Sequence, residues 1–343
     1  MAPFGMFRKT SPSPKVSLPE TALFAALSPF RVEPRFVARV WGFTDLTPWY
    51  DVAHLADPVG EVWLTGDDCR IATGAHTGKT LAQLFAESPE PLLGKGVPAS
   101  GSPLLIKVIF AREKLSVQVH PDDWLAQKIG QPRGKTECWY ALAAEPGAQV
   151  AAGLKPGVTL DQVRGAIADG SLEKDLRALT VEPGDMIFVD AGTVHAIWPG
   201  SILLETQQNS DITYRLFDYG RPRELHVDKG LEAIRLATRA GKVAPRVLPD
   251  RIILVDEDYF RVERLPVAVS RASTSLAADD ETDRGLAYLF AANGSGRLTS
   301  PSFESVDLPP HGIVAIPAAS PVFAVQDLGG LDLIRISPRW PER

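Results

Sequence analysis

The chain has 343 residues, of which 45% are hydrophobic, so it is long enough to bury one large core or two ordinary ones. Its formal net charge is -6, from 36 basic and 42 acidic residues, which gives no basic surface for the phosphates of a nucleic acid. No apolar run approaches the roughly 20 residues that a membrane-spanning helix needs. We therefore expect neither a nucleic-acid partner nor a membrane partner.

The N-terminal segment and the two cysteines indicate the compartment. Residues 1–20 carry proline and serine where a secretory signal would have its apolar core, and we expect them to form a flexible tail. Cys69 and Cys138 lie far apart, without the paired spacing of a zinc ribbon or a redox dithiol. This usage suits a reducing compartment, so we expect a cytoplasmic protein that does not depend on disulfides.

Short strand-like segments bounded by proline and glycine dominate the first two thirds of the chain. They lie at 103–111, 115–120, 137–143, 185–191 and 201–206. Residues 78–94 and 159–179 break this pattern, the second with apolar residues at helical spacing, and 226–237 is predicted to be a further helix. So many short strands favour a β-barrel or β-sandwich with helices laid beside it.

A linker is predicted at residues 238–250, after which the strand-like segments resume. These later segments lie at 251–255, 285–292 and 311–318. We expect a first domain at 21–237 and a second, smaller β-domain at 246–343. The second contains one histidine, His311, and no cluster of ligands, so we interpret it as a structural appendage without a metal.

A polar pair interrupts the apolar strand LSVQVH. Gln118 and His120 are two residues apart, so both side chains point to the same face, whereas Val117 and Val119 point to the other. The segment continues through Pro121 into two aspartates, Asp122 and Asp123, which we predict to form a solvated turn.

Two further segments carry candidate ligands. Glu137 lies near the start of a strand, so its neighbour Cys138 is expected on the opposite face, and His195 follows a turn at Gly192. Imidazole, carboxylate and carboxamide groups together would suit zinc, and two histidines with one carboxylate would equally suit ferrous iron. A single strand histidine is more often only hydrogen bonded, and we predict that His54, His76 and His226 are surface residues without a ligand role.

Three segments in order resemble one family. LSVQVHPDD (115–123), GKTECWY (134–140) and LLETQQNSDITYRLFDYGR (203–221) together closely resemble type I mannose-6-phosphate isomerases in the shorter bacterial form. The segment GDMIFVDAGTVHAI (184–197) looks like the second half of the cupin signature. The resemblance covers about residues 30–237, with weaker matches at RVWGFTDL and PVGEVWLTG, where Phe43 and Val62 replace the family's usual glycine and serine.

The resemblance implies a cupin-type β-barrel (jelly roll) that interconverts mannose 6-phosphate and fructose 6-phosphate through a metal-stabilised enediol. Carried over position by position, the ligands of one zinc ion per chain fall on Gln118, His120, Glu137 and His195. The family's catalytic positions fall on Arg215, Lys135 and Glu205, and its substrate-phosphate positions on Lys107 and Ser116. Lys107 lies in an apolar strand, where a buried ammonium needs an anionic partner or a route to water.

Two other functions are compatible with part of this pattern. His120, Glu137 and His195 alone could hold iron in a cupin oxygenase, and the scaffold could also serve a non-enzymatic sugar-binding protein. Gln118 and Lys107 argue against the oxygenase, and the full set of ligands with Arg215 and Lys135 argues against a protein without chemistry. The group that takes the proton from carbon 2 stays open between Glu205, Lys135 and metal-bound water.

Overall fold

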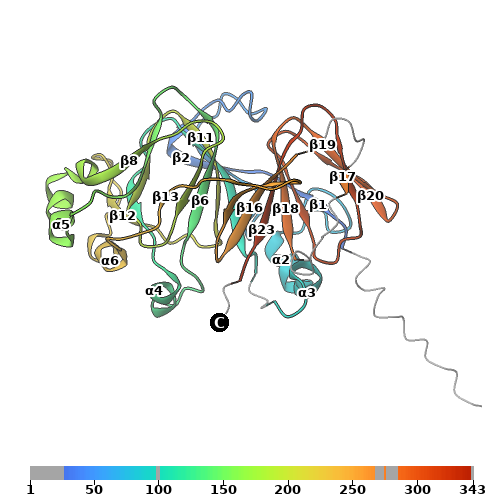
Figure 1. Cartoon of the computed structure of the whole chain (residues 1–343), viewed down its shortest axis with the longest axis horizontal. Coiled ribbons are helices and arrows are strands. Elements are labelled where there is room, and N and C mark those ends of the chain that lie inside the picture. The colour runs from blue at the N-terminus through green and yellow to red at the C-terminus, as the bar shows by residue number, and fades with distance from the viewer. Residues whose placement is uncertain (1–26, 98–100, 267–273, 276–284, 341–343) are drawn as a thin grey trace, which may run out of the picture.

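The computed structural model describes residues 27–97, 101–266, 274–275 and 285–340, and the structural statements below concern these residues. The tail expected at 1–20 lies outside them. The prediction of a mainly β protein is confirmed, because antiparallel sheets form both lobes of the molecule (Figure 1). Within the described ranges, no helix is long and apolar enough to cross a membrane.

The first lobe consists of two sheets that face each other. The larger sheet has the order β13-β9-β6-β11-β4-β3-β2. Its strands are β2 (Arg35–Phe43), β3 (Val59–Trp63), β4 (Leu104–Ala111), β6 (Glu137–Ala144), β9 (Met186–Val189), β11 (Ser201–Gln208) and β13 (Gly241–Lys242). The smaller sheet has the order β12-β5-β10-β7-β8. Its strands are β5 (Val117–Val119), β7 (Gln149–Leu154), β8 (Leu176–Thr180), β10 (His195–Ile197) and β12 (Tyr214–Phe217).

The inner faces of these two sheets share one apolar cluster. Trp139 and Leu203 from the larger sheet pack with Val150, Ala152 and Ile197 from the smaller one. The described strands stay in two separately hydrogen-bonded sheets, so the jelly roll is a sandwich and does not close into a continuous barrel. Polar side chains that point inward from either sheet are therefore brought together between them.

Two helices, α5 (Leu160–Asp169) and α6 (Val227–Ala233), cover the outer face of the smaller sheet. The prediction of one helical stretch at 159–179 is wrong in its second half. Gly170 adopts a left-handed conformation (φ 77°) that ends α5, and a 3-10 turn, η1 (Leu172–Asp175), leads into β8. Leu176 and Leu179 have helical spacing, but they lie on opposite faces of β8. Each packs in a different apolar cluster.

The predicted helical segment at 78–94 forms two short helices. The helix α2 (Leu81–Glu87) begins with a capping box between Thr80 and Gln83, and α3 (Pro89–Leu93) follows after Ser88. Both helices lie under the second lobe (Figure 1), and the Leu92 carbonyl accepts a hydrogen bond from the Ala318 amide. They therefore lie outside the space between the facing sheets of the first lobe, and their buried residues belong to the core that joins the lobes.

The second lobe also contains two sheets. The larger has the order β1-β21-β18-β23-β16-β15-β14 and the smaller β17-β22-β19-β20. The larger comprises β1 (Phe30–Val32), β14 (Arg246–Val247), β15 (Ile252–Asp256), β16 (Phe260–Leu265), β18 (Ala287–Asn293), β21 (Ile313–Ile316) and β23 (Asp332–Pro338). The smaller comprises β17 (Thr274–Ser275), β19 (Gly296–Ser300), β20 (Phe303–Leu308) and β22 (Ala324–Asp327). An early strand, β1, thus completes a sheet of late ones.

A single apolar core joins the two lobes. The outer face of the larger first-lobe sheet, with Ile106, Val108 and Leu204, packs with Phe260 and Ile334 of the second lobe. The predicted linker runs along both, since β13 pairs with β9 and β14 pairs with β15. The second lobe is therefore attached through a buried interface and can influence the strands that carry the polar residues.

Candidate active site

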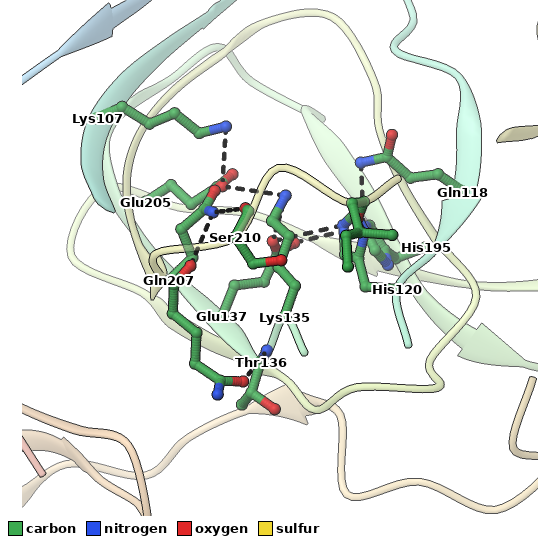
Figure 2. Close-up of polar contacts among 12 residues, drawn as sticks. Lys107, Gln118, His120, Lys135, Thr136, Glu137, His195, Glu205, Gln207 and Ser210 are labelled. Atoms are coloured by element: carbon green, nitrogen blue, oxygen red, sulfur yellow. Dashed lines mark hydrogen bonds and ion pairs between the residues drawn. The ribbon is translucent and has the colours of Figure 1, made fainter. Parts of the chain in front are cut away.

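Three buried side chains converge between the two sheets of the first lobe. One ligand atom each from His120, Glu137 and His195 lie within 4.8 Å of one another. Glu137 comes from β6 of the larger sheet, His195 from β10 of the smaller sheet, and His120 directly follows β5 (Figure 2). Their neighbour Cys138 lies in the apolar core on the other side of β6, as the alternation predicts.

Backbone carbonyls orient both imidazoles. His120 donates from Nδ1 to the Ile212 carbonyl at 2.8 Å, and His195 donates from Nδ1 to the Thr193 carbonyl at 2.9 Å. Each ring therefore presents Nε2 to Glu137, at 3.6 Å from His120 and 3.3 Å from His195. Burial lowers the pKa of His120 well below its usual value and that of His195 to about 4, so both rings are neutral.

A cation fits the cluster on the evidence of an unpaired nitrogen. His120 Nε2 is buried and has no hydrogen-bond partner among the described residues, and Glu137 Oε2 lies 3.6 Å from it while also contacting Lys135 Nζ at 3.1 Å. Buried polar atoms in folded proteins nearly always have a partner, and neutral imidazole with carboxylate is a donor set that divalent metals prefer. Oriented imidazoles of this kind are typical of metal ligands, whose second nitrogen is held by a carbonyl or carboxylate.

Gln118 borders the cluster from β5. Its Nε2 lies 3.2 Å from His195 Nε2, and its Oε1 accepts a hydrogen bond from Ser116 Oγ at 3.4 Å. A metal needs the amide oxygen, so ligation by Gln118 requires the amide to turn by half a rotation. Ser116 is itself buried on the same face, two residues from Gln118.

A chain of buried charges of alternating sign leads from the metal cluster through the larger sheet. Lys135 Nζ lies 3.1 Å from Glu137 and 3.8 Å from Glu205, and Lys107 Nζ lies 3.1 Å from Glu205 and 3.4 Å from Glu61 (Figure 2 shows all but Glu61). Each of these five side chains is buried. The anionic partner that a buried Lys107 was predicted to need is therefore present twice.

Two residues at the far end of this chain complete it. Arg39 donates to Glu61 Oε2 at 2.8 Å, and the Trp63 indole donates to the same oxygen at 2.9 Å. Arg39 is one third exposed, so the chain of charges reaches solvent at this end. Glu61 was not predicted as a site residue; the available signal was a carboxylate within the strand-like run GEVW.

The pKa values along the chain follow from burial and neighbouring charge. Burial raises the pKa of Glu205, and Glu137 raises it further. Burial opposes the charged form of Glu61, but Lys107 and Arg39 outweigh it and lower the pKa to about 2. Burial likewise opposes the charge on Lys107, yet Glu205 and Glu61 raise its pKa above the usual range. Glu205 is thus the carboxyl in the chain that is suited to carry a proton.

Arg215 enters from β12 at the edge of the cluster. It is half-buried, its Nη1 donates to the Glu224 carbonyl at 2.9 Å, and its buried Nε has no hydrogen-bond partner in the described chain. His226, predicted as a surface residue, accepts a hydrogen bond at Nδ1 from the Arg215 amide at 3.2 Å. The histidine is partly buried because it precedes α6, which packs against β12.

Sequence reasoning also missed Gln207. It is buried, pairs with Glu137 across β11 and β6, and donates from Nε2 to the Ser210 carbonyl at 2.7 Å (Figure 2). Its Oε1 has no partner within the described part of the chain, so it offers an acceptor inside the site. The signal was the same alternation that related Gln118 to His120, here between Glu205 and Gln207.

The prediction of a solvated turn at Asp122 and Asp123 is wrong. Asp122 caps α4 (Asp123–Lys128) by accepting a hydrogen bond from the Leu125 amide at 2.8 Å, and it pairs with Arg235. Asp123 is partly buried and accepts three hydrogen bonds from distant segments. The cap at Asp122 is a local signal that was overlooked, whereas Arg235 and the partners of Asp123 lie further away in sequence.

Comparisons with known proteins agree with this architecture. Residues 30–151 match the family model for the catalytic domain of type I phosphomannose isomerase. The mannose-6-phosphate isomerase ManA of Bacillus subtilis is 38% identical over 289 residues, which is 79% of this chain and 88% of that protein. The chain belongs to the type I mannose-6-phosphate isomerase family. The resemblance predicted from three sequence segments is thereby confirmed.

Solved structures of mannose-6-phosphate isomerases share the whole arrangement of lobes. The crystal structure of the Bacillus subtilis mannose 6-phosphate isomerase superposes with a TM-score of 0.80 at 30% identity, covering 91% of this chain and 100% of that one. A zinc-bound mannose 6-phosphate isomerase superposes with a TM-score of 0.73 at 18% identity, covering 91% and 100%, and shares the fold. The chain therefore shares its overall fold, including both lobes, with these isomerases.

Proposed function

We propose that this chain interconverts D-mannose 6-phosphate and D-fructose 6-phosphate, with one zinc ion held by Gln118, His120, Glu137 and His195. The observation that carries the proposal is the buried cluster of two neutral histidines and one carboxylate, placed directly beside Lys135. Membership in the mannose-6-phosphate isomerase family supports the substrate, and the unpaired Nε2 of His120 supports the metal.

The reaction moves one proton from carbon 2 to carbon 1 and another between the two neighbouring oxygens, so no co-reactant is needed. A bound zinc ion would supply electrostatic stabilisation of the enediolate and polarise the sugar oxygens. Arg215, with a planar and permanently charged guanidinium, stabilises the negative oxygen of the enediolate. Its half-buried position at the edge of the cluster allows it to meet substrate without binding the metal.

Glu205 and Lys135 are our proposed proton carriers. Burial and the charge of Glu137 raise the pKa of Glu205, which brings this carboxyl closer to the range in which it can both accept and return a proton. Lys135 lies between Glu137 and Glu205, so it can hold the carboxylate form of Glu205 and donate toward a sugar oxygen. Trp139, whose ring lies 5.6 Å from that of His195, helps to keep water out of this space.

The substrate phosphate is proposed to bind at Lys107 and Ser116. Both side chains are buried on inward-facing positions, and Lys107 is held in its charged form. Because Lys107 already contacts Glu205 and Glu61, a phosphate contact requires the ammonium to move from one carboxylate toward the ligand. Gln207 offers a further buried acceptor for a sugar hydroxyl.

We also propose that residues 21–237 form the catalytic domain, apart from β1, which pairs with β21 in the second lobe, and that 246–343 form a cupin-like domain without a metal. Cytoplasmic function is supported by Cys69 and Cys138, which are both free and buried. The small, polar substrate agrees with a site built from charged groups between two sheets.

The direct test is a coupled assay of mannose 6-phosphate conversion by the purified chain, before and after removal of metal with a chelator. We expect activity to be lost with the metal and to return with zinc. Oxygen consumption restored by ferrous iron, without isomerisation, would instead establish a cupin oxygenase. Binding of the sugar phosphate with no turnover in the zinc-loaded protein would establish a binding protein.

A further inference from the structure

The segment Gly134–Thr136 leads into β6 and places Lys135 and Glu137 in the site. Each of its three amides donates a hydrogen bond: Gly134 to Asp123 Oδ1 at 2.7 Å, Lys135 to the Pro121 carbonyl at 3.0 Å, and Thr136 to Gln208 Oε1 at 2.9 Å. The position of the metal cluster's only carboxylate therefore depends on partners outside the cluster.

Asp123 connects most of these partners. Its Oδ1 accepts both the Gly134 amide and Gln208 Nε2, the second at 2.9 Å, and its Oδ2 accepts the Tyr259 hydroxyl at 2.9 Å. Gln208 in turn holds Thr136 twice, by its side chain and by a backbone bond of 3.1 Å to the Thr136 carbonyl. Hydrogen bonds to a carboxylate are stronger than neutral ones, so Asp123 fixes this arrangement firmly.

The backbone of Gly134 confirms how closely the segment is held. A Cβ atom added at Gly134 would lie 2.4 Å from the Asp122 carbonyl carbon and 2.5 Å from the Pro121 oxygen. Only glycine allows this approach, since backbone atoms cannot move aside as a flexible side chain would. The segment after His120 and the segment before Glu137 are therefore in close contact beside Asp123.

Tyr259 comes from the second lobe. It lies between β15 and β16 and packs against the core that joins the lobes. Its carbonyl accepts a hydrogen bond from the Arg339 amide at 2.8 Å. Burial raises the pKa of the Tyr259 hydroxyl, and the neighbouring Asp123 raises it further, so it remains a donor. The described contacts thus run from the second lobe through one carboxylate to the segment that carries Lys135.

We propose that Asp123 is a positioning residue for Lys135 and Glu137, and that Tyr259 couples the second lobe to the metal centre through it. The second lobe then has a role in the reaction although none of its described residues contributes a ligand to the cluster. This inference rests on the proposed function, in which Glu137 binds zinc. Without the Tyr259 hydroxyl, Asp123 can rotate away from Gly134 and Gln208, and the segment before Glu137 loosens.

The test compares Tyr259→Phe with Tyr50→Phe in the full-length, zinc-loaded protein. Tyr50 is a matched control because its hydroxyl also donates a bond of 3.0 Å to the second lobe, to the His311 carbonyl, without contact to Asp123 or Gly134. Zinc release to a chromogenic chelator should be about tenfold faster in Tyr259→Phe, the low end of the loss that follows removal of an outer partner of a ligand. We expect kcat to fall similarly with KM little changed, and Tyr50→Phe to match the wild type in both.

Two substitutions of Asp123 grade the effect. Asp123→Asn keeps an oxygen for Gly134 and Gln208, but its Nδ2 must donate to the Tyr259 hydroxyl oxygen, which reverses that bond, so the variant should lie between the wild type and Asp123→Ala. Zinc release from Tyr259→Phe at the wild-type rate with wild-type kcat would overturn the proposal. An equal change in Tyr50→Phe would also overturn it, because the effect would then be a general loss of stability.

Amide hydrogen exchange separates this inference from the proposed function. The amides of residues 134–136 should exchange faster in Tyr259→Phe than in the wild type and Tyr50→Phe, whether or not metal is present. Unchanged exchange there contradicts the coupling. A wild-type protein that binds no zinc, yet shows faster exchange in Tyr259→Phe, would contradict only the metal assignment and support the coupling.

Discussion

Gln118 and Arg215 are direct partners across β5 and β12, so the amide proposed as a ligand and the guanidinium proposed for catalysis lie at the same level of one sheet. His195 is the partner of Gln118 on its other side, in β10. Paired residues in adjacent strands point to the same face. This row therefore places the proposed metal ligands and a permanent positive charge on one face of the sheet, and each residue can be substituted separately.

Replacement of Arg215 should separate catalysis from metal binding. We expect Arg215→Ala to lower kcat and kcat/KM together, by about 100-fold or more, with zinc content unchanged. Arg215→Lys should rescue little, because a compact ammonium cannot keep the bond to the Glu224 carbonyl and also direct two donors at adjacent oxygens. Steady-state kinetics, metal content and solvent hydrogen exchange at carbon 2 measure these effects. A raised KM with unchanged kcat would show that Arg215 only binds substrate.

The two faces of β6 give a second prediction. His195→Ala should lose zinc and activity together, because it removes a ligand and leaves Glu137 Oε1 without its neighbour. Cys138→Ser is the matched control, since this side chain lies in the core on the opposite face from Glu137 and should leave the zinc in place. Metal analysis of both purified variants is the measurement. Full zinc content in His195→Ala would refute the ligand assignment.

Lys107 should be important for stability because of its two buried partners. Lys107→Met leaves Glu205 and Glu61 without a shared cation and should lower the free energy of unfolding by about 3 to 5 kcal/mol. Adding Glu61→Gln removes one of the uncompensated charges, so the double variant should recover part of the loss. Denaturant unfolding of the metal-free proteins measures the cycle. Strictly additive losses would show that the two side chains are not coupled.

A phosphate contact at Lys107 predicts a change in substrate preference. Lys107→Met should reduce the conversion of mannose 6-phosphate much more than that of neutral mannose, since only the phosphorylated sugar loses a charge-assisted bond of about 1.5 to 3 kcal/mol. The ratio of kcat/KM for the two sugars is the measurement. An equal loss on both would assign Lys107 to holding Glu205 and Glu61 alone.

Burial of Cys69 predicts a dependence of stability on alkaline pH. Burial raises the pKa of the Cys69 thiol from its ordinary 9.0 to about 12. The folded state therefore keeps this proton where the unfolded chain loses it, so the contribution to stability is complete below pH 9.0 and is lost as the pH rises to about 12. The difference in unfolding free energy between wild type and Cys69→Ala should shrink over this range. A constant difference would contradict the shift.

Sequence alternation predicted the inner face of the site because each strand has one face against the opposite sheet. Gln118 and His120 were predicted on one face, and Glu137 and Cys138 on opposite faces, and the structure agrees with both predictions. Glu61 could not be predicted in the same way, since its meaning depends on Lys107, which lies 46 residues further along the chain. Asp123 was misjudged for the same reason. A carboxylate after a proline looks solvated until Tyr259 and Gly134 are brought to it.

Helical spacing misled where a strand has two buried faces. Leu176 and Leu179 are three residues apart, a spacing that fits one face of a helix and equally the two opposite faces of a strand. Only the pairing of β8 with β7 shows that this segment is a strand. The capping box at the start of α5 and Gly170 at its end are both local sequence signals. Gly170 alone would have been enough to predict that the helix ends there.

The pairing of β1 with β21 determines the order in which the protein can be completed during synthesis. Phe30 to Val32 leave the ribosome long before their partners Ile313 to Ala315. Contacts between such distant segments form slowly, because a long loop must close first. Until then β1 is an unpaired strand next to an unfinished apolar core, so a nascent chain would depend on protection from aggregation although the proposed metal ligands had already been synthesised.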